Sequence, residues 1–195
     1  MNLFMVGAVA AMLLAPGALR SAALAVAAAG AGVVIVYKGN VYAASRGVPF
    51  WNSPLLPVLY ATYAIRGGLA LLLVVLPLSG GGIGTRWMEM LELWVAVSAA
   101  VMLGFYLGVM RTTNVAARRS VAELTGGRAA LVFYLGTVGA GLVVPIVLGM
   151  AGLAGPVPRL LLALTGAFSL AGDFFAKYAI ARAGIYVPIM PAGRT

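Results

Sequence analysis

The amino-acid sequence predicts an all-α fold: a polytopic transmembrane helical bundle with about five full spans and a short N-terminal membrane helix. Of the 195 residues, 63% are hydrophobic and only 9% are charged, whereas a soluble domain carries roughly 25% charged residues. Apolar runs of about 20 residues, the length that crosses a bilayer, recur along the whole chain and are separated by Pro, Gly or Arg. We therefore expect an integral protein of the cell (inner) membrane.

The predicted elements follow one another closely. Residues 1–20 have an apolar core but no positive residue before it, which makes them a poor secretory signal. We expect a short membrane-embedded helix that ends near Pro16, or the remnant of a longer one. The full spans are predicted at Ser21–Ser45, Leu55–Leu76, Trp87–Met110, Ala129–Ala151 and Leu160–Ala183. Because the connections are too short for a second domain, residues 1–195 are expected to form a single transmembrane domain.

Small residues and one proline predict how the spans pack. Gly104 and Gly108 have the small-xxx-small spacing that lets two helices approach closely. Gly136 and Gly141 are expected to allow a similar approach in the fourth span. Pro145 cannot donate a backbone hydrogen bond, so a kink is predicted in that span.

The arginines in the loops predict the orientation, because cytoplasmic loops carry an excess of Lys and Arg. One side of the bundle carries seven arginines and the other side three. The larger set is Arg46, Arg111, Arg118, Arg119, Arg128, Arg182 and Arg194, and the smaller set is Arg20, Arg86 and Arg159. We therefore expect the loop around Trp51, the long fourth connection and the C-terminus in the cytoplasm.

Two residue types are missing from the sequence, and each absence excludes a kind of chemistry. Without cysteine, the protein forms no disulfide, has no thiolate nucleophile and holds no iron–sulfur cluster through thiolates. Without histidine, a haem held between two imidazoles is excluded. We expect no metal ligation and no covalently bound cofactor in this protein. Topology and lipid head groups explain the net charge of +9 better than nucleic acid, which is not an expected partner.

Ionisable residues inside predicted spans need an explanation, because each costs roughly 2.5–3.5 kcal/mol at the bilayer centre. They are Lys38, Arg66, Asp173 and Lys177. Arg66 lies near the middle of its span, too deep for its side chain to reach the membrane surface easily. It is expected to face the bundle interior or a polar cavity. It is either a functional group or a structural arginine bonded to the carbonyls of a broken helix, which Gly67 and Gly68 would favour.

The acidic residues leave two interpretations open. Asp173 and Lys177 have the i,i+4 spacing that brings side chains together, so they form either a self-neutralising pair or a proton-exchanging carboxylate with its controlling lysine. Glu89 and Glu92 begin the third span, either as interfacial residues or as the outer mouth of a proton path. Together with Arg66, these residues are candidates for a proton path or for structural polar contacts.

Polar neighbours surround Lys38. Tyr37 and Asn40 share one helix face, while Lys38 and Tyr42 share an adjacent one. Hydroxyl, amide and ammonium groups together could bind a carbonyl-bearing ligand, although the Lys38 stem is also long enough to reach toward the surface. From the residues alone, a transporter, a channel, a redox anchor and an assembly factor all remain open.

Residues 37–71, YKGNVYAASRGVPFWNSPLLPVLYATYAIRGGLAL, resemble the central segment of the NrfD/polysulfide reductase family of membrane subunits. The residues that carry this resemblance are Tyr37, Gly39, Val48, Pro49, Phe50, Trp51, Asn52, Ser53, Pro54, Leu55, Pro57 and Gly67. Residues 120–150 and 170–189 resemble two later segments of the family, in the last of which an arginine commonly takes the place of Lys177. The resemblance covers residues 21–188. We expect the loop to be a rigid corner between two spans, with Trp51 as an interfacial anchor.

The resemblance implies a haem-free membrane anchor subunit of a multi-subunit respiratory oxidoreductase, of the kind used in anaerobic respiration. Such subunits pass electrons between menaquinone or ubiquinone and a ferredoxin-like iron–sulfur subunit, which serves a molybdopterin-type catalytic subunit. By resemblance, Tyr37 is expected to face the quinone, with Lys38 and Asn40 nearby.

The sequence departs from this family pattern in two ways. It resembles a shortened member whose front helices are absent, and with them a histidine of the quinone pocket. Another membrane subunit supplies that part, or quinone chemistry is lost and the protein is a purely structural anchor. A small transporter or proton-conducting membrane subunit is the alternative from a different class.

Overall fold

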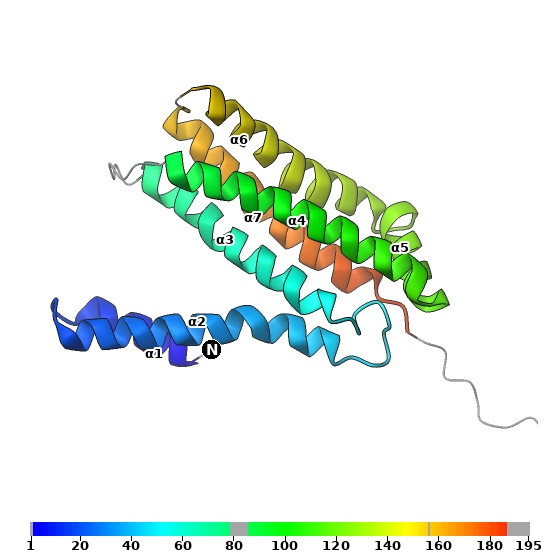
Figure 1. Ribbon diagram of the computed structural model, residues 1–195, viewed down its shortest axis with the longest axis horizontal. Helices are drawn as coiled ribbons and strands as arrows, with labels where there is room; N and C mark the ends of the chain where they lie inside the picture. Colours follow the sequence, from blue (N-terminus) through cyan, green and yellow to red (C-terminus); the bar gives the residue numbers. More distant parts are fainter. Residues whose placement is uncertain (1, 79–85, 156, 187–195) are drawn as a thin grey trace, which may run out of the picture.

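The computed structural model describes residues 2–78, 86–155 and 157–186, and the regular elements in these ranges are helices (Figure 1). Five of them are long and apolar enough to cross a membrane, which confirms the predicted all-α polytopic fold. The elements are α1 (Asn2–Leu13), α2 (Ala18–Ala43), α3 (Leu55–Leu78), α4 (Arg86–Thr113), α5 (Val115–Gly126), the π-helix η1 (Val132–Val143), α6 (Val144–Ala154) and α7 (Arg159–Ala183).

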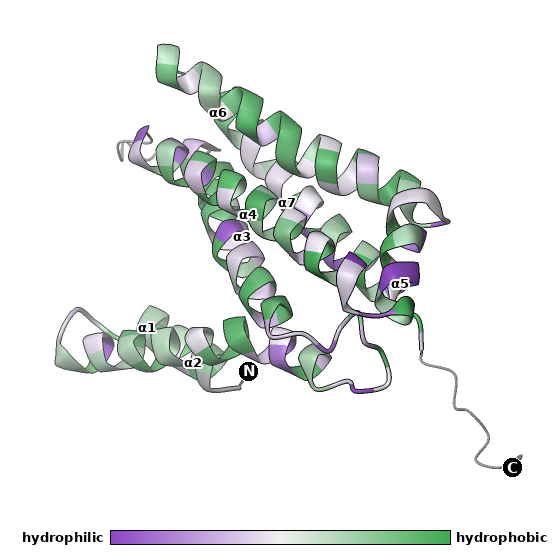
Figure 2. Ribbon diagram, turned by 45° about the vertical axis from the view of Figure 1, so that its right-hand side comes forward, coloured by the Kyte–Doolittle hydropathy of each residue, from purple (hydrophilic) through white to green (hydrophobic). Residues whose placement is uncertain are grey.

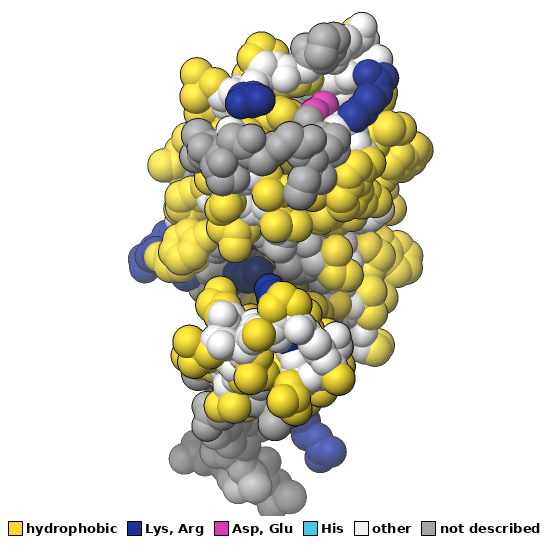
Figure 3. All heavy atoms as spheres, turned by 90° about the vertical axis from the view of Figure 1, so that its left-hand side faces the viewer, with side chains coloured by type: hydrophobic (Ala, Val, Ile, Leu, Met, Phe, Trp, Pro, Cys, Tyr) yellow, Lys and Arg dark blue, Asp and Glu magenta, His cyan; other side chains and the backbone are white. Residues whose placement is uncertain are grey.

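The helices form a bundle and a divergent hairpin. Helices α3, α4 and α7 and the continuous η1–α6 rod lie side by side, with α7 in contact with α3, α5, η1 and α6 (Figure 1). Helices α1 and α2 pack against each other, and the hairpin they form is inclined to the bundle (Figure 2). Polar positions interrupt the otherwise hydrophobic helices of the bundle in the same view. Hydrophobic side chains also cover most of the face shown in Figure 3, as expected for a surface in contact with lipid.

Glycines set the closest helix contacts. A Cβ atom on Gly39 of α2 would lie 2.4 Å from the Pro57 Cα of α3, and one on Gly172 of α7 would lie 2.0 Å from the Gly141 Cα of η1. The prediction that Gly141 allows close approach is therefore confirmed. The same prediction is wrong for Gly104 and Gly108 within the described part of the protein, because Cβ atoms there would meet nothing within 4 Å.

The loop at residues 44–54 is held on both sides. Tyr106 of α4 stacks on Phe50 at 5.3 Å between ring centroids and donates its hydroxyl proton to the Phe50 carbonyl. The Trp51 indole donates to the Ile180 carbonyl of α7 at 3.0 Å and meets Tyr42 edge-on at 5.1 Å. The expectation that Trp51 is an interfacial anchor is thus replaced by an internal contact that fastens the loop to α7.

Helix α5 lies in the connection that the sequence analysis treated as a loop. The Asn114 side chain accepts a hydrogen bond from the Ala117 backbone and so caps the helix. One face is buried, and Ser120 on that face accepts a hydrogen bond from the Ile185 backbone at 3.1 Å. Arg118 is exposed on the other side. The helix therefore covers this end of the bundle and ties it to the segment after α7.

The fourth span changes its winding at Pro145. Residues 132–143 form a π-helix, and an α-helix with Pro145 in its first turn continues it. Pro145 has no backbone N–H, so it cannot pair with the carbonyl of Gly141, its partner in a regular α-helix. The irregularity predicted from Pro145 is present, and it takes the form of a π-helical segment.

Candidate functional site

Arg66 is at the centre of the bundle. It lies eleven residues after the start of α3 at Leu55, which places it about 16 Å along the helix and near the middle of the span. Its side chain is 0% exposed. A charge at this depth is expensive unless other groups pair with it, so its partners decide whether the arrangement is stable.

The guanidinium of Arg66 bonds to groups from three other helices. Its Nε lies 3.2 Å from Glu92 Oε1 of α4, and its Nη1 lies 3.0 Å from Asp173 Oδ1 of α7. Its Nη2 donates to Ser169 Oγ of α7 at 2.9 Å and to the Gly141 carbonyl of η1. We call these five residues the Arg66 cluster. It meets both expectations for Arg66, since it faces the interior and bonds to a carbonyl of an irregular helix.

Pro145 and Gly172 together make the Gly141 carbonyl available to Arg66. Pro145 removes the N–H with which this carbonyl would pair in an α-helix. Gly172 has no side chain, so η1 and α7 come into backbone contact at Gly141. The carbonyl thereby reaches the same guanidinium as the side chains of Ser169 and Asp173, which flank Gly172 on α7.

Several polar atoms of this region are buried and have no partner among the described residues. They are Glu92 Oε2, Asp173 Oδ2, Tyr63 Oη and Thr137 Oγ1. Glu92 and Asp173 are 2% and 4% exposed, and each uses only one of its two oxygens on Arg66. Asp173 Oδ2 lies against Gly67, where a Cβ atom would approach it to 3.2 Å. Such atoms call for a proton, a water molecule or another donor, because an unpaired buried oxygen is costly.

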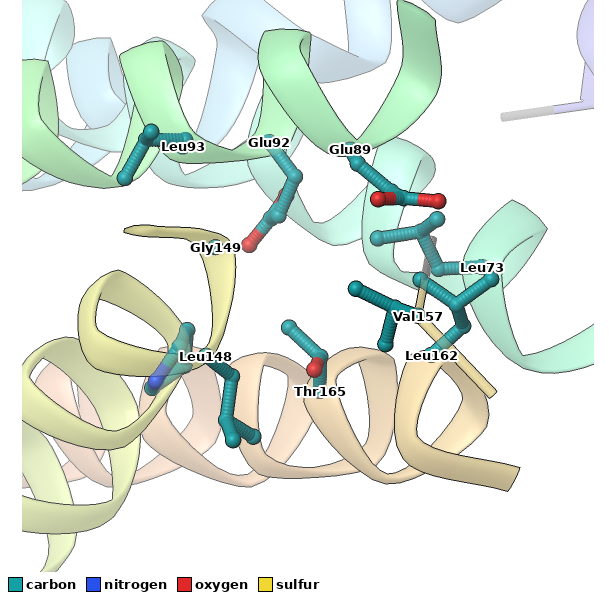
Figure 4. A pocket seen from close by; sticks show the side chains of 10 residues that line it. Leu73, Glu89, Glu92, Leu93, Leu148, Gly149, Val157, Leu162 and Thr165 are labelled. Carbon is teal, nitrogen blue, oxygen red and sulfur yellow. The ribbon is translucent and has the colours of Figure 1, made fainter. Parts of the chain in front are cut away.

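A narrow cavity connects the Arg66 cluster with Glu89. Its volume is about 10 Å³, close to the space that a single water molecule needs. Figure 4 shows Glu92 directed into the space between α4, α6 and α7, opposite Thr165, with Glu89 beside it. A Cβ atom on Gly152 of α6 would lie 3.0 Å from Glu89 Oε2. The half-buried Glu89 therefore stands at the outer end of the cavity.

A groove lies between α2, α3 and α7. Two adjoining hollows of about 220 and 160 Å³ share Lys38, Tyr60 and Lys177, and Tyr37 and Tyr42 also line the larger one. Both lysines lie near the same ends of their helices, about 8–9 Å from Ala43 and Ala183. Basic side chains are visible in the recess between the hairpin and the bundle (Figure 3).

The structure separates two residues that the sequence paired. Asp173 forms its ion pair with Arg66, and no ion pair within 4.0 Å joins it to Lys177 in the described part of the protein. The interpretation of Asp173 and Lys177 as a self-neutralising pair is therefore wrong. Lys177 instead lines the groove, one turn beyond Asp173 on the same helix.

The predicted quinone-facing residues are divided in a similar way. Tyr37 and Lys38 line the groove, whereas the Asn40 amide donates to the Val36 carbonyl of its own helix at 2.9 Å and does not line it. Sequence reasoning missed Tyr60, which is 4% exposed and lines both hollows. It also missed Ser169, because a serine in an apolar helix carries no signal of its own.

The groove offers groups that fit a quinone, and the described residues offer no metal site. Two ammonium groups and the phenols of Tyr37, Tyr42 and Tyr60 are hydrogen-bond donors suited to the carbonyl oxygens of a quinone ring. No group of three or more His, Cys, Asp or Glu able to hold a metal ion occurs in residues 2–78, 86–155 and 157–186.

These features define a class first: a multi-pass helical membrane protein with a buried ionic cluster and a basic groove. Comparison with known proteins then identifies the family. The family described as "Polysulphide reductase, NrfD" matches residues 3–189. The protein belongs to this family, as its loop and later segments predicted.

Two curated relatives show how far the similarity extends. The protein is 31% identical over 119 residues to "Protein NrfD" of Escherichia coli (strain K12), covering 57% of its own length and 37% of that relative. It is 30% identical over 120 residues to the third polypeptide, C, of the polysulfide reductase of Wolinella succinogenes, covering 59% of its own length and 38% of that relative. The matches thus span less than two-fifths of these relatives' lengths. No solved structure gives a significant match.

Proposed function

We propose that this protein is the membrane anchor subunit of a multi-subunit respiratory oxidoreductase. In this role it links the menaquinone or ubiquinone pool to a ferredoxin-like iron–sulfur partner, which serves a molybdopterin-type catalytic subunit. Membership of the NrfD family supports the membrane role. We further propose that the arginine-rich end, with the loop of residues 44–54 and helix α5, faces the cytoplasm, because that end carries most of the loop arginines.

The observation that carries the proposal is the groove between α2, α3 and α7. Quinones are dissolved in the hydrocarbon, so their site must be reached from the bilayer. Lys38 and Tyr37 are exposed on α2, and the groove beside them is lined by Tyr60 and Lys177. Two ammonium groups that have no carboxylate within 4.0 Å among the described residues are costly in a membrane, and a carbonyl-bearing ligand would supply acceptors for them.

The residues of this protein have separate roles in the proposed site. Quinol oxidation supplies two electrons and two protons, and the electrons pass to the iron–sulfur partner. Lys38 and Lys177 orient the ring oxygens, while the Tyr37 hydroxyl donates a further hydrogen bond from the open side. Asn40, on the neighbouring face of α2, borders the site. Lys177 also lies one turn from Asp173, which places the groove next to the Arg66 cluster.

Purification from native membranes in mild detergent tests the assignment. A stoichiometric iron–sulfur partner together with extractable quinone is the expected result. A partner without quinone would reduce the protein to a structural anchor. Isolation of the protein alone, with substrate-dependent flux in vesicles, would favour a small transporter or proton-conducting subunit, for which the buried Arg66 cluster is the supporting observation.

Site-directed variants of the purified complex test the groove itself. Tyr37→Phe and Lys38→Gln should both slow quinol oxidation while the complex stays assembled. Tyr134→Phe is the matched control, because Tyr134 is an exposed tyrosine on η1 that does not line the groove. Unchanged turnover in Tyr37→Phe and Lys38→Gln would remove the groove as the quinone site.

A further inference from the structure

We propose that Glu92 and Asp173 together hold one exchangeable proton in the middle of the membrane, and that this proton enters through the cavity beside Glu89. The inference concerns the Arg66 cluster alone and does not need a quinone in the groove. The relevant observations are the number of charges in contact, the two unpaired carboxylate oxygens and the water-sized cavity that adjoins Glu92.

Within ion-pair distance the cluster has more acid than base. Arg66 contacts both Glu92 and Asp173, and its guanidinium keeps its proton under all ordinary conditions. With both carboxylates ionised the three groups would carry a net negative charge in the hydrocarbon interior. One proton on the carboxyl pair makes them neutral, which removes most of the cost of burial.

The surrounding helices do not supply the missing positive charge by contact. Lys177 is on the same helix as Asp173 but forms no ion pair with it within 4.0 Å among the described residues, and it faces Lys38 across the groove. Among the titratable groups nearby, Tyr63 lies one turn before Arg66 on α3, and Glu89 lies one turn before Glu92 on α4. Neither adds a positive charge.

The hydrogen-bond pattern indicates where the proton sits. Glu92 Oε1 receives two donors, Arg66 Nε at 3.2 Å and Ser169 Oγ at 2.6 Å. Glu92 Oε2 and Asp173 Oδ2 receive none from the described residues. An ionised carboxylate this deeply buried would need donors on both oxygens. A protonated oxygen needs none, and it can give its hydrogen to a water molecule in the adjoining cavity.

The cavity provides a route to one membrane face. It is lined by both Glu89 and Glu92, and it has room for about one water molecule. Glu89 is half-buried three residues after the start of α4, at the end opposite to helix α5. A proton therefore passes from Glu89 through one water to the Glu92 carboxylate, and the Arg66 guanidinium keeps Asp173 within the same cluster.

Infrared spectroscopy of the purified protein, depleted of quinone, tests this proposal. The protein has only 4 acidic residues, so its carboxyl signals are few. At neutral pH we expect one carboxylic-acid C=O band, which shifts on transfer to D₂O. Glu123→Gln is the matched control, because Glu123 lies on α5 outside the spans, and it should leave the band unchanged.

The variants of the cluster have distinct expected results. Glu92→Gln and Asp173→Asn should each remove the band, because a single carboxylate then pairs with Arg66 in its ionised form. Glu89→Gln should keep the band and slow its exchange with D₂O several-fold. No protonated carboxyl at neutral pH, or a band that survives in both cluster variants, would overturn the proton site. Unchanged exchange in Glu89→Gln would overturn the entry route.

Discussion

The Gly141 Cα lies 2.0 Å from the position that a Cβ atom would occupy on Gly172. No side chain fits between η1 and α7 at this point. The contact is also what brings the Gly141 carbonyl to the Arg66 guanidinium. Packing of two helices and pairing of a buried charge therefore depend on the same pair of glycines.

Gly172→Ala should destabilise the protein strongly. The added methyl group must push η1 and α7 apart and lengthen the contact of Arg66 with Gly141, so a loss of at least 1–3 kcal/mol is expected, about the cost of overpacking a core. Thermal unfolding of the purified protein in detergent measures the effect. Gly104→Ala is the control, because its methyl group meets nothing within 4 Å and should stabilise helix α4 by about 0.5–1 kcal/mol. Equal behaviour of the two variants would contradict the contact.

Single and double replacements should differ sharply in the Arg66 cluster. Glu92→Gln or Asp173→Asn leaves one carboxylate for Arg66, so each should lower the unfolding free energy by less than the roughly 3–5 kcal/mol expected for a broken buried ion pair. The double variant leaves Arg66 without a counter-charge and should lose that amount or more. Chemical or thermal unfolding in detergent gives the comparison. A double variant as stable as either single one would show that other groups neutralise Arg66.

Tyr106→Phe should weaken the loop of residues 44–54. It leaves the buried Phe50 carbonyl without the Tyr106 hydroxyl, and an unpaired buried carbonyl costs about 1–3 kcal/mol. The stacking of the two rings at 5.3 Å is retained, so the loop should loosen without unfolding. Limited proteolysis after residue Arg46 should become faster in the variant. An unchanged cleavage rate would mean that ring packing alone holds the loop.

The orientation of the protein is directly testable, because its sequence has no cysteine. Val115→Cys places a thiol at the exposed start of α5, and Gly155→Cys places one at the opposite end, where a Cβ atom meets nothing within 4 Å. A membrane-impermeant maleimide applied to intact cells should label Gly155→Cys and leave Val115→Cys unlabelled until the cells are opened. The reverse pattern would invert the proposed topology.

The sequence was sufficient for the spans and insufficient for one helix. Long apolar runs predicted all five membrane helices, and α2 begins at Ala18 where Ser21 had been predicted. Helix α5 was treated as a loop because its arginines dominate the composition. Its signals were present, however: Asn114 is a suitable N-cap, and the buried Ala117, Val121 and Leu124 follow at helical spacing.

The site could be predicted only in part, because a sequence does not specify how helices rotate about their axes. Arg66 was correctly expected to face the interior, since no other position accommodates a charge at the midplane. Its two acidic partners lie 26 and 107 residues away, and local spacing favoured Lys177 as the partner of Asp173. Tertiary packing decided otherwise, by turning Lys177 toward the groove while Asp173 points to Arg66.

Helix α7 presents Ser169, Asp173, Lys177 and the Ile180 carbonyl on successive turns, so the buried cluster, the groove and the Trp51 loop are all attached to a single rod. Neighbouring attachment points are separated by about 5–6 Å along its axis. An axial slide of this rod would alter all three regions together. A partner that pulls on the loop would thereby change the hydrogen bonding of Arg66 at the bilayer midplane.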